Sequence, residues 1–469
     1  MQSLKEQEDR RLTLRGITWP IFIELFLQTI MGSTDVIMLS HISDDVVASI
    51  GVANQLVFFA IILFNFTASG TAVLISQYLG AGMRLEAKQA SAISLSINLG
   101  IGLVVSLLLV IFKGPLLGIF HLEDDIAGIG FEYLSIVGGT LFLQSVLVTV
   151  SAILRANGFS KEAMFVSVMM NIIHLTGNAL VIYGLFGFPE MGVKGVALST
   201  AISRAAALVI AFVFMYRRLP IRIEIQDYFN FNLTHIKKIM KIGVPSAGEQ
   251  LSYNTSQMAM TAIIAMLGAA ALSTRVYTWN VMSFIMLFGL AFGQGTQILI
   301  GYKVGAGDFE AAYRQLLKSL KVSFIITIFI AIFVSIFRVN IMSLFTDNKE
   351  IIKTGSTLLL LCLILEPGRT FNLVVINSLR ATGDAVFTVK MGVLSMWGIA
   401  VPLSYFLGIH YGLGLAGVWI AFITDEWLRG IIMYYRWKSR AWESKVLVQK
   451  KQRKPVSSYP IKLVKENNR

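Results

Sequence analysis

Apolar runs long enough to cross a lipid bilayer recur along almost the whole chain. A transmembrane helix needs roughly 20 apolar residues, and about twelve such stretches can be marked: 16–40, 47–79, 87–112, 128–153, 163–186, 193–216, 240–264, 272–302, 315–337, 354–379, 386–409 and 412–435. With 55% apolar and 14% charged residues, the composition excludes a soluble globular protein. The sequence therefore predicts an all-α polytopic membrane protein with twelve transmembrane helices.

Basic residues concentrate in alternate loops. One set of loops carries Arg84, Lys88, Arg155, Lys161, Arg217, Arg218, Arg222, Lys303, Arg314, Lys318, Arg380 and Lys390. The other set is acidic or nearly uncharged, except for a loop with Arg338, Lys349 and Lys353. The positive-inside rule places the basic loops and both termini in the cytoplasm. We expect a multi-pass protein of the cell (plasma) membrane, and we assign the net charge of +13 to membrane topology, with no nucleic-acid partner.

Short motifs recur at a fixed offset of 225 residues. The matching pairs are Gly70-Thr71 with Gly295-Thr296, Gly80-Ala81-Gly82 with Gly305-Ala306-Gly307, and Leu154-Arg155-Ala156 with Leu379-Arg380-Ala381. The pattern predicts a six-span amino-terminal lobe (16–216) and a six-span carboxy-terminal lobe (240–435), related by a pseudo-two-fold axis along the membrane normal. Such halves usually enclose a site at their interface and alternate by rocking.

Three segments lie outside the predicted lobes. Residues 1–15 form a cytoplasmic start, and the amphipathic stretch 217–239 is typical of a linker lying along the cytoplasmic interface. The tail 436–469 carries Lys450, Lys451, Arg453 and Lys454, a composition that favours attraction to anionic lipids. We expect a monomer.

The first span carries two carboxylates, Glu24 and Asp35, behind Pro20. A carboxylate in hydrocarbon is costly, so its presence indicates function. At 100° per residue both acids lie on one stripe, roughly 16 Å apart along the helix axis. Pro245 and Glu249 repeat the Pro-x-x-x-Glu spacing in the second half. Glu24 and Glu249 therefore lie at matched depth, where they either form a paired cation site or pair with the loops at Arg155 and Arg380.

Together, the Pro20 to Asp35 helix, the repeated Gly-Ala-Gly ends, the run Gln294-Gly295-Thr296-Gln297 and the two Arg-Ala-x-Gly loops resemble the multidrug and toxic compound extrusion (MATE) family. The resemblance covers about 16–435. It implies two six-helix lobes around a V-shaped central cavity. It also implies secondary active antiport: export of organic, often cationic or lipophilic compounds in exchange for H⁺ or Na⁺, by alternating access. An enzyme is not expected, since no His-Glu-x-x-His or Gly-x-Ser-x-Gly motif occurs and the five histidines are scattered.

The same resemblance implies roles for individual residues. Asp35 matches the first-helix acid that takes part in proton or cation coupling, and Asn178 matches a polar position near it, which packing alone could also explain. Glu249 is the seventh-helix acid, although in sodium-binding members this acid lies further along the helix. Cavity-facing polar candidates are Asn178, Asn372 and Gln28, and candidate hinge or gating positions are Pro20, Pro245, Pro367, Gly82, Gly307, Arg155 and Arg380.

The coupling ion is predicted from the shortage of oxygen ligands for a hard cation. In the second half Glu366 has Arg369 as an i,i+3 partner, and Asp425-Glu426 lie near Arg429, which leaves only Glu249 without an obvious basic neighbour. We therefore expect H⁺ coupling without any prosthetic cofactor, with Na⁺ at Asp35 and Asn178, or at Glu249, as the alternative.

The rival function is a flippase for lipid-linked oligosaccharides or polysaccharides. Flippases of related architecture line their cavity with several arginines that hold phosphates. Here we expect only Arg204 and Arg369 within spans, which favours extrusion of small organic substrates.

Overall fold

The computed structural model describes residues 12–448, and within this range the chain forms helices and loops but no β-strand. The predicted all-α fold is confirmed. In the first half, the long helical segments are α2 (Leu14–Ser40), α3 (Asp44–Gly80), α4 (Arg84–Ile111), α6–η1–α7 (Asp124–Gly138 and Leu141–Ala156), α8 (Ser160–Tyr183) and α9 (Gly192–Arg218). In the second half they are α11 (Leu233–Ala265), α12 (Ala269–Gly305), α13 (Phe309–Ile336), α15 (Lys349–Thr382), α16–η3–α17–η4 (Ala385–His410) and α18 (Gly414–Lys438).

These long segments correspond one by one to the twelve predicted spans. Nine of them are long and apolar enough to cross a membrane by themselves, and the pair α6–η1 and α7, bent by 45°, makes a tenth. The other two, α11 and α18, carry more polar and charged side chains, among them Glu249 in α11 and Asp425 and Glu426 in α18.

Short helices fill equivalent places in the two halves. The single-turn helices α5 (Lys113–Gly118) and α14 (Arg338–Ser343) each follow the third long helix of their half. Between the halves lies α10 (Ile225–Phe229). Its Asp227 forms an ion pair with Lys88 of α4, with 2.8 Å between Oδ2 and Nζ. A 3₁₀ turn, η2 (Leu185–Gly187), joins α8 to α9, and another, η5 (Ala441–Lys445), follows α18. The basic-tail residues 450–454 lie outside the described range.

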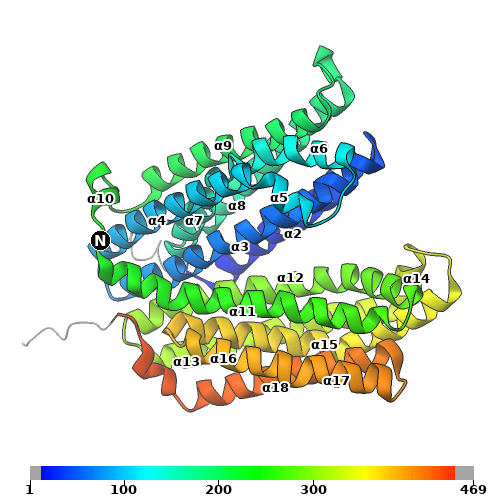
Figure 1. The fold of residues 1–469 in the computed structure, drawn as a ribbon. Helices are drawn as coiled ribbons and strands as arrows, with labels where there is room; N and C mark the ends of the chain where they lie inside the picture. The colour runs from blue at the N-terminus through cyan, green and yellow to red at the C-terminus, as the bar shows by residue number, and fades with distance from the viewer. Residues whose placement is uncertain (1–11, 449–469) are drawn as a thin grey trace, which may run out of the picture.

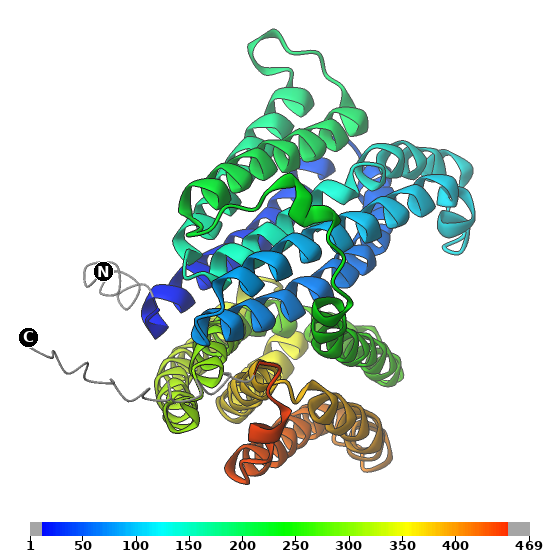
Figure 2. The same cartoon turned by 90° about the vertical axis from the view of Figure 1, so that its left-hand side faces the viewer.

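The helices form two bundles (Figures 1 and 2). Helices α2–α9 make one lobe and α11–α18 the other. Figure 1 shows the lobes close together at the end where α10 lies and diverging towards the end where α14 lies. We call the first of these the basic end, because the basic loops at Arg84, Arg155, Lys303 and Arg380 lie there, and we call the second the opposite end.

Glycines let the two lobes touch at the basic end. A Cβ on Gly80 of α3 would lie 2.0 Å from the backbone oxygen of Tyr302, and a Cβ on Gly305 of α12 would lie 2.0 Å from that of Gln77. No side chain fits there, so the backbones themselves are in contact. The turns just beyond need glycine for another reason, since Gly82 and Gly307 have φ of +75° and +79°. In each Gly-Ala-Gly motif, the first glycine thus makes the contact between the lobes and the second makes the turn that follows it.

Hydrogen bonds between the lobes obey the same symmetry. Gln77 Nε2 donates to the Ala381 carbonyl at 2.7 Å, and Tyr302, at the repeat-equivalent position, donates its hydroxyl to the Ala156 carbonyl at 2.9 Å. Ala156 and Ala381 are themselves repeat equivalents. Gln77 Oε1 also accepts from the backbone nitrogens of Leu447 and Val448, at 3.1 and 3.2 Å. These contacts hold the lobes together at the basic end.

Candidate functional site

Asp35 lies near the opposite end of α2, beside α8. The amide nitrogen of Asn178 donates to Asp35 Oδ1 at 3.2 Å. Asn178 is buried, with 1% of its surface exposed, whereas the Asp35 side chain keeps 26% exposure. The structure therefore brings together the two residues that the sequence analysis paired, and leaves the carboxylate accessible.

His174 completes this cluster and was missed from the sequence, where the histidines were treated only as scattered. Its Nδ1 lies 3.5 Å from Asp35 Oδ1, and its Nε2 lies 3.1 Å from the Thr200 hydroxyl of α9 and 3.4 Å from the amide nitrogen of Asn178. The ring is buried, with 4% exposed. A sequence signal existed: His174 and Asn178 are four residues apart on one helix and so share a face.

Three polar atoms of Asn178, His174 and Arg204 have no hydrogen-bond partner within the described chain. They are Asn178 Oδ1, His174 Nδ1 and one terminal nitrogen of Arg204. Arg204, on α9, is close enough to interact electrostatically with Asp35, but the two side chains form no ion pair in the part of the molecule that is described. Asp35 is therefore a carboxylate near a positive charge that does not neutralise it directly.

Glu24 and Glu249 both form ion pairs with arginines. Arg155 Nη1 of α7 lies 2.9 Å from both carboxylate oxygens of Glu24, and Arg380 Nη2 of α15 lies 2.6 Å from Glu249 Oε2. Each pair joins residues 131 positions apart within one lobe, so the repeat reproduces the interaction itself. The expectation that Glu249 lacks a basic neighbour is wrong, because the sequence could not show which way Arg380 turns. The sequence left two alternatives for Glu24 and Glu249, a paired cation site or ion pairs with the basic loop ends. The structure shows the ion pairs with Arg155 and Arg380.

The carboxy-terminal lobe contains a buried network of five charges on α15 and α18. Arg369 Nη1 binds Glu366 Oε1 at 2.8 Å, and Arg429 Nη2 lies 2.8 Å from Asp425 Oδ2 and 3.0 Å from Glu426 Oε2. Arg369 Nε lies 3.6 Å from Glu426 Oε1, which joins the two groups. Asn372 does not stand free in this lobe, because its amide donates to Glu426 Oε2 at 2.8 Å.

The expectation of only two arginines within spans is also wrong. Arg275 of α12 and Arg429 of α18 lie within helices too. Arg429 is matched by Asp425 and Glu426, whereas Arg275 Nη2 reaches the side-chain oxygen of Gln257 at 3.1 Å. Arg275 is therefore held by polar residues of α11. Arg369 and Arg429 are held by ion pairs with Glu366, Asp425 and Glu426.

The remaining predicted positions lie along the central helices. Pro20, Pro245 and Pro367 stand inside α2, α11 and α15, and Gln28 is exposed on α2. One turn and a half before Gln28, Phe22 stacks on Phe288 of α12, with ring centroids 4.0 Å apart. This aromatic contact joins the lobes two residues before Glu24 on α2.

Two parallel six-helix lobes that meet at one end, with an accessible carboxylate in one of them, define a membrane transporter of the two-lobe type. Comparison with known proteins identifies the family. The MatE family profile matches residues 20–180 and 245–406, so its two matched segments begin at the repeat offset of 225 residues. The chain belongs to the MatE (multidrug and toxic compound extrusion) family of membrane transporters.

Relatives match over nearly the full length. The uncharacterized transporter YisQ of Bacillus subtilis is 47% identical, over 94% of this chain and 97% of its own. The probable multidrug resistance protein NorM of Thermotoga maritima is 24% identical, over 96% of this chain and 97% of its own. A solved structure described as MATE in the bent conformation superposes with a TM-score of 0.85 at 19% identity, covering 91% of this chain and 94% of that one. The structural likeness shows a shared fold.

Proposed function

We propose that this protein is a secondary active antiporter that exports organic, cationic or lipophilic drug-like compounds in exchange for H⁺, with Asp35 as the exchange site. The observation that carries the proposal is the difference between Asp35 and the other embedded acids. Within residues 12–448, Glu24, Glu249, Glu366, Asp425 and Glu426 each have an arginine ion pair, and Asp35 has none. An acid that is already neutralised by arginine has little to exchange.

The contacts of Asp35 suit alternate binding of a proton and a cation. When ionised, the carboxylate is held by the Asn178 amide and offers negative charge to a cationic substrate. When protonated, it loses that attraction and the substrate leaves. Because the lobes touch at the basic end, a proton would reach Asp35 in this conformation from the opposite end. His174, 3.5 Å away, can orient the carboxyl group or pass the proton on.

The proposal includes a topology and a way of moving. The basic end is cytoplasmic, the membrane is the plasma membrane, and the protein acts as a monomer. Reorientation then requires the Gly80 and Gly305 contact to part, while each lobe keeps its own Glu–Arg pair. Those two pairs fix α2 to α7 and α11 to α15, which supports rocking of the lobes as rigid bodies.

Sodium coupling is the second candidate, and one observation favours it. Asn178 Oδ1 is buried without a hydrogen-bond partner in the described chain, and a hard cation could take this oxygen together with Asp35. Sodium needs further oxygens at the same point, and the hydroxyl of Thr200 in this cluster already bonds to His174.

The flippase alternative receives less support from the charges. Phosphates are held best by cations that no carboxylate neutralises. Arg204 and Arg275 form no ion pair within the described chain, but in the carboxy-terminal lobe Arg369 and Arg429 are outnumbered by three carboxylates. Relatives described as multidrug resistance proteins also favour extrusion of small organic molecules.

Efflux from energised cells tests the proposal. Cells that produce the protein are loaded with a fluorescent lipophilic cation, and the H⁺ and Na⁺ gradients are collapsed separately. We expect export to stop when the H⁺ gradient is collapsed and to continue in Na⁺-free medium. Export that follows the Na⁺ gradient alone would move the coupling role to the second candidate.

A further inference from the structure

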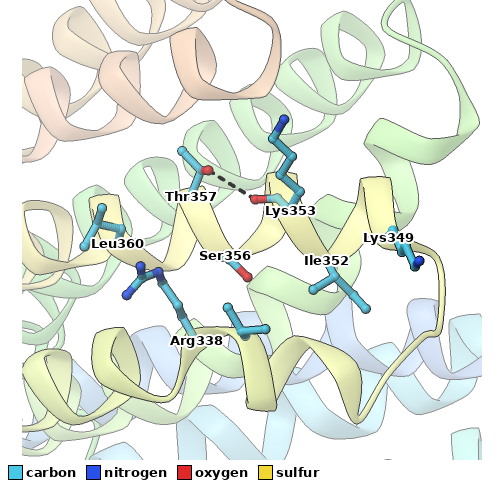
Figure 3. A pocket seen from close by; sticks show the side chains of 8 residues that line it. Arg338, Lys349, Ile352, Lys353, Ser356, Thr357 and Leu360 are labelled. Carbon is cyan, nitrogen blue, oxygen red and sulfur yellow. Dashed lines mark hydrogen bonds between the residues drawn. The ribbon is translucent and has the colours of Figure 1, made fainter.

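A groove at the opposite end of the carboxy-terminal lobe gathers three cations that nothing above has used. It lies between α14 and the start of α15, with a volume of about 490 Å³, and is lined by Arg338, Val339, Lys349, Ile352, Lys353, Ser356, Thr357 and Leu360 (Figure 3). These are the same cations that form the exception to the charge pattern of the loops. The positive-inside rule disfavours them at this end of the molecule.

The three cations lack an acidic partner. Within the described residues, none of Arg338, Lys349 and Lys353 forms an ion pair, although Asp347 and Glu350 are on the same segment. Arg338 uses Nη1 to bond the Ser335 carbonyl at 2.8 Å, which leaves its other guanidinium nitrogens available. The groove therefore has a net positive charge.

A buried hydroxyl in the groove also lacks a partner. Ser356 is only 6% exposed, and its Oγ has no hydrogen-bond partner within the described chain. Figure 3 shows Ser356 on α15, on the side that faces the segment carrying Arg338. Its neighbour Thr357 is satisfied, because it donates to the Lys353 carbonyl at 3.1 Å. A buried, unpaired hydroxyl beside cations is suited to an anionic oxygen.

The rest of the groove is apolar and continues onto a surface that would face lipid. Val339 and Leu360 are 52% and 44% exposed; Phe333 at the end of α13, Phe337 just before α14 and Ile364 on α15 are 54%, 44% and 52% exposed. In a membrane-spanning protein such side chains contact acyl chains. The groove thus combines a cationic rim at the depth of the headgroups with an apolar wall along the chains.

The repeat provides an internal comparison. At the 225-residue offset, Arg338 corresponds to Lys113, which donates to the Ser135 hydroxyl at 2.5 Å, whereas Lys349 corresponds to Asp124, Lys353 to Gly128 and Ser356 to Phe131. The amino-terminal lobe thus has the corresponding short helix, α5, and its first cation, but lacks the two lysines and the unpaired hydroxyl. The cluster is not a requirement of the fold.

We propose that this groove binds one anionic phospholipid of the adjacent leaflet. Its phosphate lies beside Arg338 and accepts from the Ser356 hydroxyl, Lys349 and Lys353 add positive charge at the rim of the groove, and an acyl chain runs along Val339, Ile352 and Leu360. The site does not depend on the substrate or ion that the transporter uses.

Native mass spectrometry of the purified full-length protein in detergent tests the proposal. Phosphatidylglycerol and phosphatidylcholine with identical chains are offered in competition. We expect the wild-type protein to retain the anionic lipid preferentially. Each basic residue near a lipid surface contributes ~1 kcal/mol, so the variant K349Q/K353Q should lose this preference by about tenfold or more. The matched control K113Q/K194Q removes two positive charges at the same end of the other lobe, and it should bind like the wild type.

Three results would overturn the proposal. The wild-type protein could bind both lipids equally, or the control could lose the preference as strongly as K349Q/K353Q. Glycerol 3-phosphate could displace bound phosphatidylglycerol as well as the intact lipid does, which would show an anion site without a role for acyl chains. The conservative variant K349R/K353R should keep the preference, and this distinguishes lost recognition from a folding defect.

Discussion

At the scale of the residue, Glu24 and Asp35 show how one helix can carry two acids with different tasks. Glu24 is 7% exposed and both its oxygens lie 2.9 Å from Arg155. Asp35 is more accessible and is held only by an amide and an imidazole. A neutralised acid fixes two helices to each other, whereas one without a counterion can change its charge. We therefore propose that Glu24 is a structural acid and Asp35 an exchanging acid on α2.

The first prediction concerns Asp35. Asparagine keeps the shape and hydrogen bonding of the side chain but cannot exchange a proton, so D35N should accumulate normally in the membrane while export falls to background. Fluorescent-substrate efflux, corrected for protein level, measures this. D45N removes an exposed acid at the same end of the molecule and should export normally. Normal efflux by D35N would exclude Asp35 from the mechanism.

The second prediction concerns the Glu24–Arg155 pair. Removing one partner of a buried pair leaves an uncompensated charge, so E24Q should destabilise the protein by about 3 kcal/mol. The double variant E24Q/R155Q removes both charges and should recover most of this loss. Thermal unfolding in detergent provides the measurement. The same cycle at Glu249 and Arg380 should give the same pattern, and purely additive losses in both cycles would contradict the pairing.

The sequence predicted the site in part. The position of a residue within its span gives its depth in the membrane, but it does not show which side chain of a neighbouring helix that residue contacts. Asp35 and Asn178 could be paired since each comes late in a helix that runs to the same end. The pairing of Glu249 with Arg380 could be offered only as one of two alternatives, because a long side chain can leave a loop end in any of several directions. His174 was not predicted, although it lies four residues before Asn178 on the same helix, and neither Arg275 nor Arg429 was expected within a span.

At the scale of the element, the fold was more predictable than the site. Apolar runs long enough for a bilayer admit only a helix, so the twelve spans could be marked to within a few residues. The sequence did not show that α6–η1 and α7 form a bent pair, which the structure bends by 45°. No proline or long polar stretch marks this break, which consists of Gly139 and Thr140.

The third prediction concerns the glycine contact between α3 and α12. An alanine Cβ at Gly305 would meet the Gln77 carbonyl at 2.0 Å, and backbone cannot yield as a flexible side chain does. G305A should therefore destabilise this lobe contact by about 2 kcal/mol or more, seen as a lower melting temperature. G51A, in α3, is the control, since nothing lies within 4 Å of a Cβ there. Equal melting temperatures for both variants would contradict the close contact.

At the scale of the whole molecule, the account depends on parallel repeats. The fourth prediction is that Ala81 and Ala306, which are repeat equivalents in the Gly-Ala-Gly turns, face the same side of the membrane. Cysteines placed there should react with an impermeant thiol reagent only from the cytoplasm, and one at Asp125 only from outside. Background should be low because Cys362, the one cysteine of the chain, is buried. Labelling of the two turns from opposite sides would rule out the parallel arrangement.

The whole transporter has two lobes that meet through Gly80 and Gly305, with the proposed exchange site, Asp35, in one of them. The lobes are not equivalent in chemistry. The amino-terminal lobe holds Asp35 without an arginine partner, and the carboxy-terminal lobe holds a network in which every acid is paired. This asymmetry within a symmetric fold is the reason for placing coupling in the amino-terminal lobe.

Transport by the purified protein in vesicles tests this placement most directly. The protein is reconstituted into Na⁺-free vesicles, a pH gradient is the only driving force, and uptake of a fluorescent organic cation is followed for the wild type, D35N and E249Q. The account predicts uptake by the wild type and none by D35N. For E249Q it predicts uptake, at a rate reduced in proportion to its stability. The opposite result would contradict this placement: uptake that occurs only when Na⁺ is added, that is lost in E249Q and that is retained in D35N.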